Sequence, residues 1–177
     1  MSAIIIINGV PESGKTTFTK FCREILEKQD KKNHVLTASN VANIKILAKR
    51  IGWDGNKDLK GRKFLSDLKI ALDSYNDYTK ASCKNLCSYL GENDYVFIDM
   101  REIEDIDFAV KEYGAHSVFV RNKRIKKQKY GNIADDNVSK YKYKTYINNN
   151  GSLKDLYNLA ADFIKEIQNT KRYMKKE

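Results

Sequence analysis

The stretch that decides the fold lies near the start of the chain and reads Gly9-Val10-Pro11-Glu12-Ser13-Gly14-Lys15-Thr16-Thr17. It matches G-x-x-x-x-G-K-[ST], the pattern of a phosphate-binding loop, or P-loop. Four isoleucines at residues 4–7 precede the motif and indicate a buried strand. Apolar side chains then recur at helical spacing, at Phe18, Phe21, Ile25 and Leu26. The motif therefore lies where its chemistry needs it, on a turn from a strand into a helix.

Such a turn predicts a site for phosphate groups, because backbone N–H groups and the positive end of a helix dipole point at one spot. Gly9 and Gly14 would let the backbone approach a phosphate closely. Lys15 would reach the β- and γ-phosphates, and the Thr16 hydroxyl can ligate Mg²⁺. The predicted phosphate-binding set is Gly9, Glu12, Ser13, Gly14, Lys15, Thr16 and Thr17.

The bulk composition predicts a folded protein. A chain of 177 residues is most simply one domain, and its 41% hydrophobic content argues against disorder. No apolar run approaches the ~20 residues of a membrane span, and no signal peptide is recognisable. The odd number of cysteines, three, favours free thiols in a reducing cytosol. Cys83 and Cys87 lie one helical turn apart, a spacing that matches no zinc motif. We therefore expect a cytoplasmic protein.

The charge balance is basic, with 33 Lys and Arg against 23 Asp and Glu, a net charge of +10. Such an excess attracts polyanions, of which nucleic acid and nucleotide phosphates are two candidates. A compositional bias without function is a third interpretation. Outside residues 121–129 and 171–176 the basic residues are spread out, which argues against a nucleic-acid interface. We expect small nucleotide substrates as partners and leave monomer and homodimer open.

Strands and helices alternate along the chain. Further strands are predicted at residues 34–38, 95–99, 117–120 and 144–147, and further helices at about 41–51, 62–76, 80–90, 102–113 and from 152 onward. We expect Ser39 to cap the first of these helices and Ser152, with Asp155, to cap the last. The alternation predicts a three-layer α/β P-loop fold, with a mainly parallel five-stranded sheet and helices on both faces. Residues 1–168 would form one domain, and 169–177 a loose basic tail.

Charged residues follow two of the predicted strands. Asp99 ends strand 95–99, which is the Walker B pattern, in which a buried strand delivers an Asp that orients Mg²⁺ or its waters. Arg101 follows two residues later, and Arg121 ends strand 117–120. Ligands bind at the carboxyl ends of parallel strands, so we expect these side chains to converge on the P-loop. Thr16 and Asp99 are the predicted metal ligands.

The predicted helix 62–76 carries a polar stripe beside its apolar one, namely Arg62, Ser66, Lys69, Asp73 and Asn76 beside Leu65, Leu68, Leu72 and Tyr75. The polar stripe fits either a solvated helix face or one wall of a cleft. In the second case Arg62, Lys69 and Asp73 would bind an acceptor substrate, because the guanidinium fork matches phosphate oxygens. The acceptor region would span about residues 39–90.

Two further segments have simpler interpretations. The charged stretch at about 122–143 has no clean periodicity, and a loop of this length is usually a functional lid or disordered. The acidic residues at the start of helix 102–113, Glu102, Glu104, Asp105 and Asp107, complement the helix dipole, so a structural role suffices for them.

A switch GTPase is excluded by two departures from its motifs. The D-x-x-G motif requires a glycine three residues after Asp99, where this chain has Glu102. Ile125 stands where the guanine motif N-K-x-D needs a carboxylate. A small-molecule kinase fits better, because phosphoryl transfer needs mainly positioning and positive charge, which Lys15, Mg²⁺, Arg101, Arg121 and a basic lid would supply. A lid that excludes water would favour transfer over hydrolysis.

The stretch from Tyr95 to Asn122, Y-V-F-I-D-M-R-E-I-E-D-I-D-F-A-V-K-E-Y-G-A-H-S-V-F-V-R-N, resembles the phage-type deoxynucleoside monophosphate kinases, as does Y-I-N-N-N-G-S-L-K-D-L from Tyr146 to Leu156. The resemblance covers the P-loop and about the C-terminal half. The chain departs from the family in a shorter middle and in Asn149, where the family tends to have Asp. The block from Gly61 to Lys69 also looks like a segment of small P-loop proteins, and by resemblance belongs to the acceptor-binding region.

The resemblance implies transfer of the ATP γ-phosphoryl group to a nucleoside or deoxynucleoside monophosphate. It carries over the P-loop residues, Asp99, Arg101 and Arg121, with Lys15, Arg101 and Arg121 as catalytic residues. ATP and Mg²⁺ would be required. Phosphomevalonate kinase and dephospho-CoA kinase share the same general plan, so another small phosphorylated acceptor is an alternative. A P-loop module that binds nucleotide without transferring phosphate is a second alternative.

Overall fold

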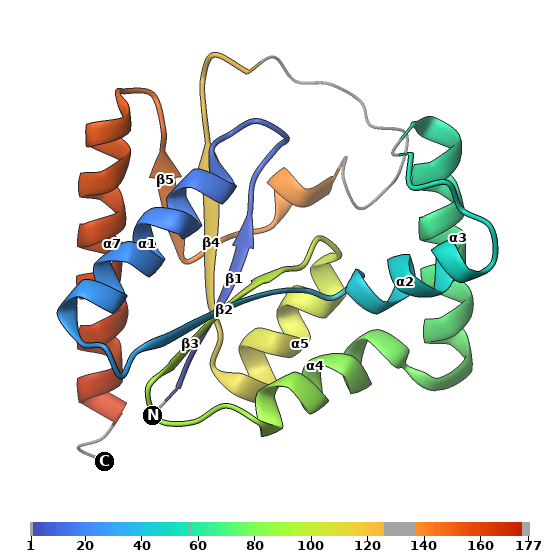
Figure 1. Ribbon diagram of the computed structural model, residues 1–177, viewed down its shortest axis with the longest axis horizontal. Helices are drawn as coiled ribbons and strands as arrows, with labels where there is room; N and C mark the ends of the chain where they lie inside the picture. The colour runs from blue at the N-terminus through green and yellow to red at the C-terminus, as the bar shows by residue number, and fades with distance from the viewer. Residues whose placement is uncertain (1, 57, 126–136, 175–177) are drawn as a thin grey trace.

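A five-stranded parallel sheet lies at the centre of the protein, whose computed structural model describes residues 2–56, 58–125 and 137–174 (Figure 1). The strands are β1 Ala3–Asn8, β2 His34–Ser39, β3 Asp94–Asp99, β4 His116–Arg121 and β5 Thr145–Asn148. Their order is β2-β3-β1-β4-β5, and every neighbouring pair is parallel. In the register, Ile5 on β1 is paired with Phe97 on β3 and His116 on β4. This confirms the predicted α/β fold class.

Strand β1 is central because its run of isoleucines is apolar on both faces of the sheet. Side chains alternate between the two faces of a strand. Ile5 and Ile7 belong to one hydrophobic core and Ile6 to another, and all three are buried. A parallel sheet with both faces covered calls for such continuous apolar strands.

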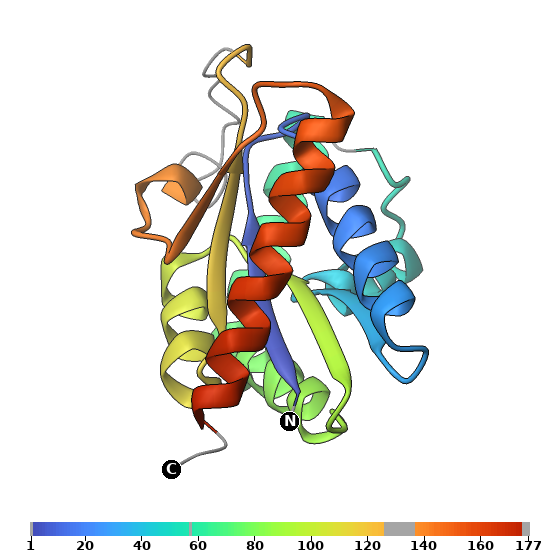
Figure 2. The same cartoon turned by 90° about the vertical axis from the view of Figure 1, so that its left-hand side faces the viewer.

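Helices cover both faces of this sheet. On one face, α1 (Lys15–Gln29) lies beside the long helix α7 (Leu153–Met174) (Figures 1 and 2). Ring contacts join the two helices, with centroids 5.5 Å apart for Phe18 and Phe163 and 5.3 Å apart for Phe21 and Tyr157. On the other face lie α4 (Tyr78–Ser88) and α5 (Ile103–Tyr113). Helices α2 (Ala42–Arg50) and α3 (Leu59–Asn76) extend from the end of β2 (Figure 1).

The beginning of α7 confirms the predicted capping box. The backbone N–H of Asp155 donates to Ser152 Oγ at 3.2 Å, and the backbone N–H of Ser152 donates to Asp155 Oδ2 at 2.8 Å. The reciprocal pair satisfies two N–H groups that have no partner within the helix. The prediction that Ser39 caps α2 is wrong. Ser39 is the last residue of β2, and the helix begins three residues later with Val41 at its N-cap.

Helix α7 continues into the segment 169–177 that is predicted as a loose basic tail, and it ends at Met174. Just before this segment Ile167 is buried, and the Gln168 side-chain amide donates to Gln29 Oε1 at 2.8 Å. Residues 175–177 lie outside the described part of the chain.

Helix α3 also differs from its prediction. It begins earlier, at Leu59, because Asp58 accepts a hydrogen bond from the backbone N–H of Gly61 at 2.7 Å and caps it. The predicted apolar stripe is not buried, and Tyr75 is 87% exposed. The buried residues of α3 are Gly61 and Lys69. Within the polar stripe Lys69 is buried, whereas Asn76 at its end is exposed.

Half of the predicted lid at residues 122–143 lies outside the described chain, which omits residues 126–136. After this gap, Val138–Lys140 form a 3₁₀ turn, η1, and Val138 and Tyr143 are buried. Within the described residues, no helix combines the length and the apolar character that crossing a bilayer requires.

Candidate active site

The predicted P-loop, residues 9–16, connects β1 to α1 and bends sharply. Backbone φ angles are positive at Gly9 (155°), Glu12 (63°) and Gly14 (97°). A Cβ atom at Gly9 would lie 2.3 Å from the backbone oxygen of Val120 on β4, so only glycine fits there. The turn ends at Lys15, the first residue of α1, and this end of the helix favours an anion.

The connection from β5 to α7 holds the P-loop from the side. The side-chain amide of Asn149 donates to the backbone oxygen of Ser13 at 2.9 Å. A Cβ atom at Gly14 would lie 2.3 Å from the same amide nitrogen. Residues 148–151 read Asn-Asn-Asn-Gly, which is typical of a turn, but no local pattern links Asn149 to a loop more than a hundred residues earlier.

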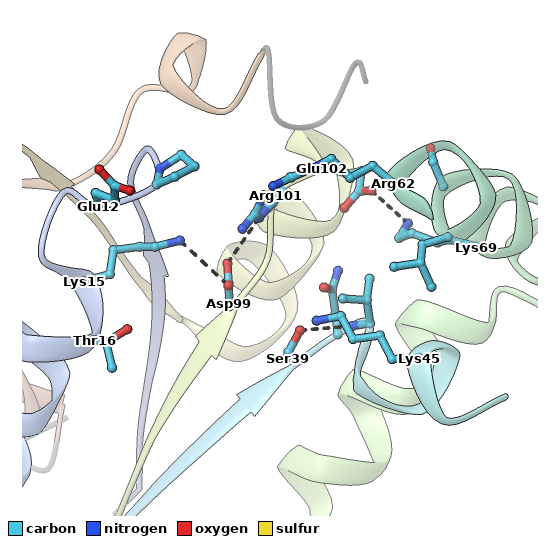
Figure 3. Close-up of a pocket in the computed structure, with 15 residues that line it drawn as sticks. Glu12, Lys15, Thr16, Ser39, Lys45, Arg62, Lys69, Asp99, Arg101 and Glu102 are labelled. Atoms are coloured by element: carbon cyan, nitrogen blue, oxygen red, sulfur yellow. Dashed lines mark hydrogen bonds and ion pairs between the residues drawn. The ribbon is translucent and has the colours of Figure 1, made fainter. Parts of the chain in front are cut away.

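Lys15, Asp99 and Arg101 meet at the carboxyl end of β3, as expected (Figure 3). Lys15 Nζ lies 3.8 Å from Asp99 Oδ2, and Arg101 Nε lies 3.7 Å from Asp99 Oδ1. Burial lowers the pKa of the Lys15 ammonium below its usual value; the Asp99 carboxylate opposes this shift, and Arg101 adds to it. Asp99 Oδ1 and Ser13 Oγ are buried and have no hydrogen-bond partner among the described residues.

A cavity of about 410 Å³ lies beside these residues (Figure 3). The P-loop and Arg101 line one part of it, and Lys45 on α2 and Arg62 and Ser66 on α3 line another. This volume is within the range of small-molecule sites, ~300–1,000 Å³. Arg62, Ser66 and Lys69 of the polar stripe thus form part of a cleft wall, whereas Asp73 and Asn76 do not line the cavity.

Lys69 on α3 also borders this cavity, but its ammonium is enclosed by three carboxylates. Nζ lies 2.7 Å from Asp73 Oδ2, 3.1 Å from Asp105 Oδ2 and 3.7 Å from Glu102 Oε1. Burial alone would lower the pKa of Lys69, but Asp73, Glu102 and Asp105 raise it above its usual value. Burial raises the pKa of Asp105 to about 6, although the Lys69 charge opposes the shift. We call these four residues the Lys69 cluster.

The Lys69 cluster was missed by the sequence interpretation. From the sequence, the acids at the start of α5 need only a helix-dipole role, and Lys69 and Asp73 are predicted to bind the acceptor substrate. The side-chain amide of Asn40, after β2, also donates to Asp105 Oδ2 at 3.0 Å. One contact of the cluster could have been predicted from the sequence. Lys69 and Asp73 are four residues apart on one helix, a spacing that favours an ion pair.

Arg121 lies elsewhere. It is exposed at the end of β4, where Nε donates to Asn148 Oδ1 at 2.5 Å and the guanidinium lies 5.1 Å from the centroid of the Tyr146 ring. It does not line the cavity, and neither does Asp73. The structure therefore brings together Glu12, Lys15, Thr16, Arg62, Lys69, Asp99 and Arg101, and leaves the catalytic role of Arg121 a prediction.

A second cavity, of about 330 Å³, is also lined by Lys15 and Thr16. Thr19 and Arg23 of α1 and Thr37 of β2 line it. It shares Lys15, Thr16 and Asp99 with the first cavity, so both open onto the same strand end.

Comparison with solved structures supports the fold assignment. One of the matching structures is a protein described as a "putative kinase" from Chloroflexus aurantiacus J-10-fl, with a TM-score of 0.50 and 11% sequence identity over 91% of this chain and 97% of that chain. At this identity the likeness bears on the fold alone, and it agrees with the parallel α/β architecture. No model of a protein family matches the sequence. A search of curated proteins likewise gives no match.

Proposed function

We propose that this protein is a phosphotransferase that moves the γ-phosphoryl group of ATP, with Mg²⁺, to a nucleoside or deoxynucleoside monophosphate. The observation that carries the proposal is the single cavity bordered by Lys15 and Thr16 of the P-loop, by Asp99 and Arg101 after β3, and by Arg62 of α3. A donor site and a basic acceptor site thus adjoin one another. Phosphoryl transfer requires this adjacency, because catalysis rests on positioning and on charge around the moving group.

The donor half of the site is the P-loop. Its backbone N–H groups and the N-terminus of α1 would hold the β- and γ-phosphates. Lys15 is half-buried and paired with Asp99 at 3.8 Å, a distance long enough for a phosphate oxygen to compete for the ammonium. Ser13 Oγ, buried and without a described partner, would gain one from a bound phosphate.

The residues present fit a magnesium ion. Asp99 Oδ1 accepts no hydrogen bond from the described residues, and the Thr16 hydroxyl borders the same cavity. Among those residues, no group of three or more His, Cys, Asp or Glu side chains forms a metal cage. Mg²⁺ in phosphoryl-transfer sites is bound by one or two carboxylates together with substrate phosphates and water. When bound, the ion would neutralise charge on the transferring group.

The acceptor half is basic. Lys45 and Arg62 come from α2 and α3, and Arg101 follows β3. A guanidinium binds phosphate oxygens through two parallel N–H bonds, so Arg62 and Arg101 are suited to an acceptor that already carries a phosphate. Transfer from ATP to such an acceptor would join the γ-phosphorus to an acceptor phosphate oxygen and break the bond to the β-phosphate oxygen, releasing ADP.

One observation favours a second candidate function, a kinase of another small phosphorylated metabolite. No aromatic side chain among the described residues lines the larger cavity. Stacking on an aromatic ring is a common way to hold a base and contributes ~1–3 kcal/mol per base in nucleic-acid complexes. An acceptor of the phosphomevalonate or dephospho-CoA type would not depend on such a ring.

A panel of acceptors tests these functions. ATP and Mg²⁺ are incubated with the protein and with each nucleoside monophosphate, each deoxynucleoside monophosphate and a set of non-nucleotide phosphate esters, and ADP is measured. We expect at least one nucleotide acceptor to raise ADP formation above the rate without acceptor, and Lys15→Ala to abolish the increase. If only a non-nucleotide ester does so, the second candidate is correct. If no acceptor does so, the transferase proposal fails and a binding module remains.

A further inference from the structure

We propose that Lys69 is a positioning residue, not a ligand of the acceptor: its ammonium fixes α3 against α5 and so sets where Arg62 lies relative to Arg101. This inference rests on the proposed transfer to a phosphorylated acceptor. It replaces the expectation that Lys69 and Asp73 bind the acceptor directly.

The charge of Lys69 is already paired within the protein. A lysine ammonium has three N–H donors, and three carboxylates surround this one at 2.7, 3.1 and 3.7 Å. The side chain is 9% exposed, and the three acids outnumber the one cation. A phosphate that approached Lys69 would have to displace a carboxylate and face the remaining ones. Lys15, Lys45, Arg62 and Arg101 are the other cations that line this cavity.

Helix α3 lies outside the two hydrophobic cores of the protein. None of its apolar side chains is fully buried, Ile70 is 59% exposed, and Lys69 is the buried side chain of the helix. The Lys69 cluster joins α3 to Asp105 of α5, and Asn40 extends the cluster to the segment after β2. Asp73 also accepts a hydrogen bond from the backbone N–H of Thr79 on α4 at 2.8 Å. The cluster therefore ties α3 to three neighbouring parts of the chain.

The same contacts link the two arginines. Arg62 precedes Lys69 by seven residues, about two turns of helix, and so lies on the same face of α3. Glu102, which holds Lys69 at 3.7 Å, is the next residue after Arg101. Arg62 and Arg101 are thus connected through the Lys69–Glu102 ion pair (Figure 3). Releasing Lys69 would let α3 shift and would change the spacing of the two guanidinium groups.

The test compares Lys69→Met with Lys63→Met. Methionine keeps the aliphatic stem of lysine but removes the charge. Lys63 is the matched control, because it lies on the same helix and forms a 2.7 Å pair with Asp67, four residues later, but both partners are exposed. The measurements are the KM for the acceptor, the KM for ATP, kcat, and backbone hydrogen exchange of residues 59–76.

We expect Lys69→Met to raise the acceptor KM at least tenfold, leave the ATP KM within twofold, and speed exchange in α3, whereas Lys63→Met changes none of these. The inference is overturned if both KM values rise together, which is the result of a general loss of structure, or if exchange in α3 is unchanged. If Lys69→Met does not fold, Glu102→Gln takes its place, because Lys69 then keeps Asp73 and Asp105. Hydrogen exchange needs no substrate, so absence of transfer by the wild type would refute the proposed function without deciding the role of Lys69.

Discussion

The contact between Asn149 and the P-loop makes a quantitative prediction for Gly14→Ala. A Cβ atom at Gly14 would lie 2.3 Å from Asn149 Nδ2, so the amide has to move and its hydrogen bond to Ser13 is lost. The φ angle of 97° adds backbone strain for any residue other than glycine. The variant therefore loses stability for two separable reasons, one local and one that depends on Asn149.

The two contributions to the loss of stability are backbone strain and the lost hydrogen bond of Asn149, and a control variant measures the strain by itself. Left-handed strain is ~1–2 kcal/mol for a non-glycine residue. Loss of a hydrogen bond that leaves a buried carbonyl unsatisfied adds ~1–3 kcal/mol. Gly52→Ala measures strain alone, because its φ is 104° and no described atom lies within 4 Å of a Cβ there. We expect Gly14→Ala to destabilise the protein by about 3 kcal/mol and Gly52→Ala by about 1 kcal/mol.

A double-mutant cycle separates the two contributions to Gly14→Ala. The free energy of unfolding is measured in urea for the wild type, Gly14→Ala, Asn149→Ala and the double variant. In the Asn149→Ala background the amide is already absent, so the alanine at position 14 meets only backbone strain. The effects should fall short of additivity by about 1–2 kcal/mol. Additivity within ~0.5 kcal/mol would refute the proposed coupling between Asn149 and the P-loop.

Three further predictions concern single side chains. Lys15→Ala should lower kcat by ~10²–10³ while circular dichroism stays unchanged, and near-normal turnover would contradict the role of Lys15. Arg62→Ala should raise the acceptor KM by ~10–100-fold because a charge-assisted phosphate contact is lost, and a change confined to the ATP KM would show that α3 is not the acceptor wall. His116→Gln should lose less stability than the wild type when the pH is lowered from 7.5 to 4.5. The free energy of unfolding in urea is measured for both proteins at both pH values.

The direction of the pH effect follows from the environment of His116. Its Nε2 lies 2.8 Å from Thr145 Oγ1, and burial, aided by the charge of Lys144, lowers its pKa to about 4 even though Glu166 Oε1 is 3.6 Å away. The unfolded chain then binds the proton more tightly, so stability is lost as pH falls from about 6.5 toward 4. Between the two pH values the wild type should lose about 2 kcal/mol more than His116→Gln. Equal losses would contradict a buried neutral histidine.

The sequence by itself determined the elements whose signals are local. The isoleucines of β1 and the glycines of the P-loop placed the central strand and the turn after it, and Ser152 with Asp155 gave the beginning of α7. These signals work because side-chain periodicity and capping involve residues at most four positions apart. The alternation of strands and helices indicated that the strands run parallel, which places Asp99, Arg101 and the P-loop at the same edge of the sheet.

Only the tertiary structure decided which distant side chains meet. Lys69 and Asp105 are 36 positions apart, and Asn149 and Ser13 are 136 positions apart. Their contacts depend on how whole helices and loops pack against one another, and no local sequence pattern determines that packing. The apolar stripe of α3 was a misleading local signal for the same reason. The orientation of α3 buries the ammonium of Lys69 among carboxylates and leaves the leucines of the apolar stripe partly exposed. An ion taken out of water requires charged partners, whereas a leucine tolerates partial exposure.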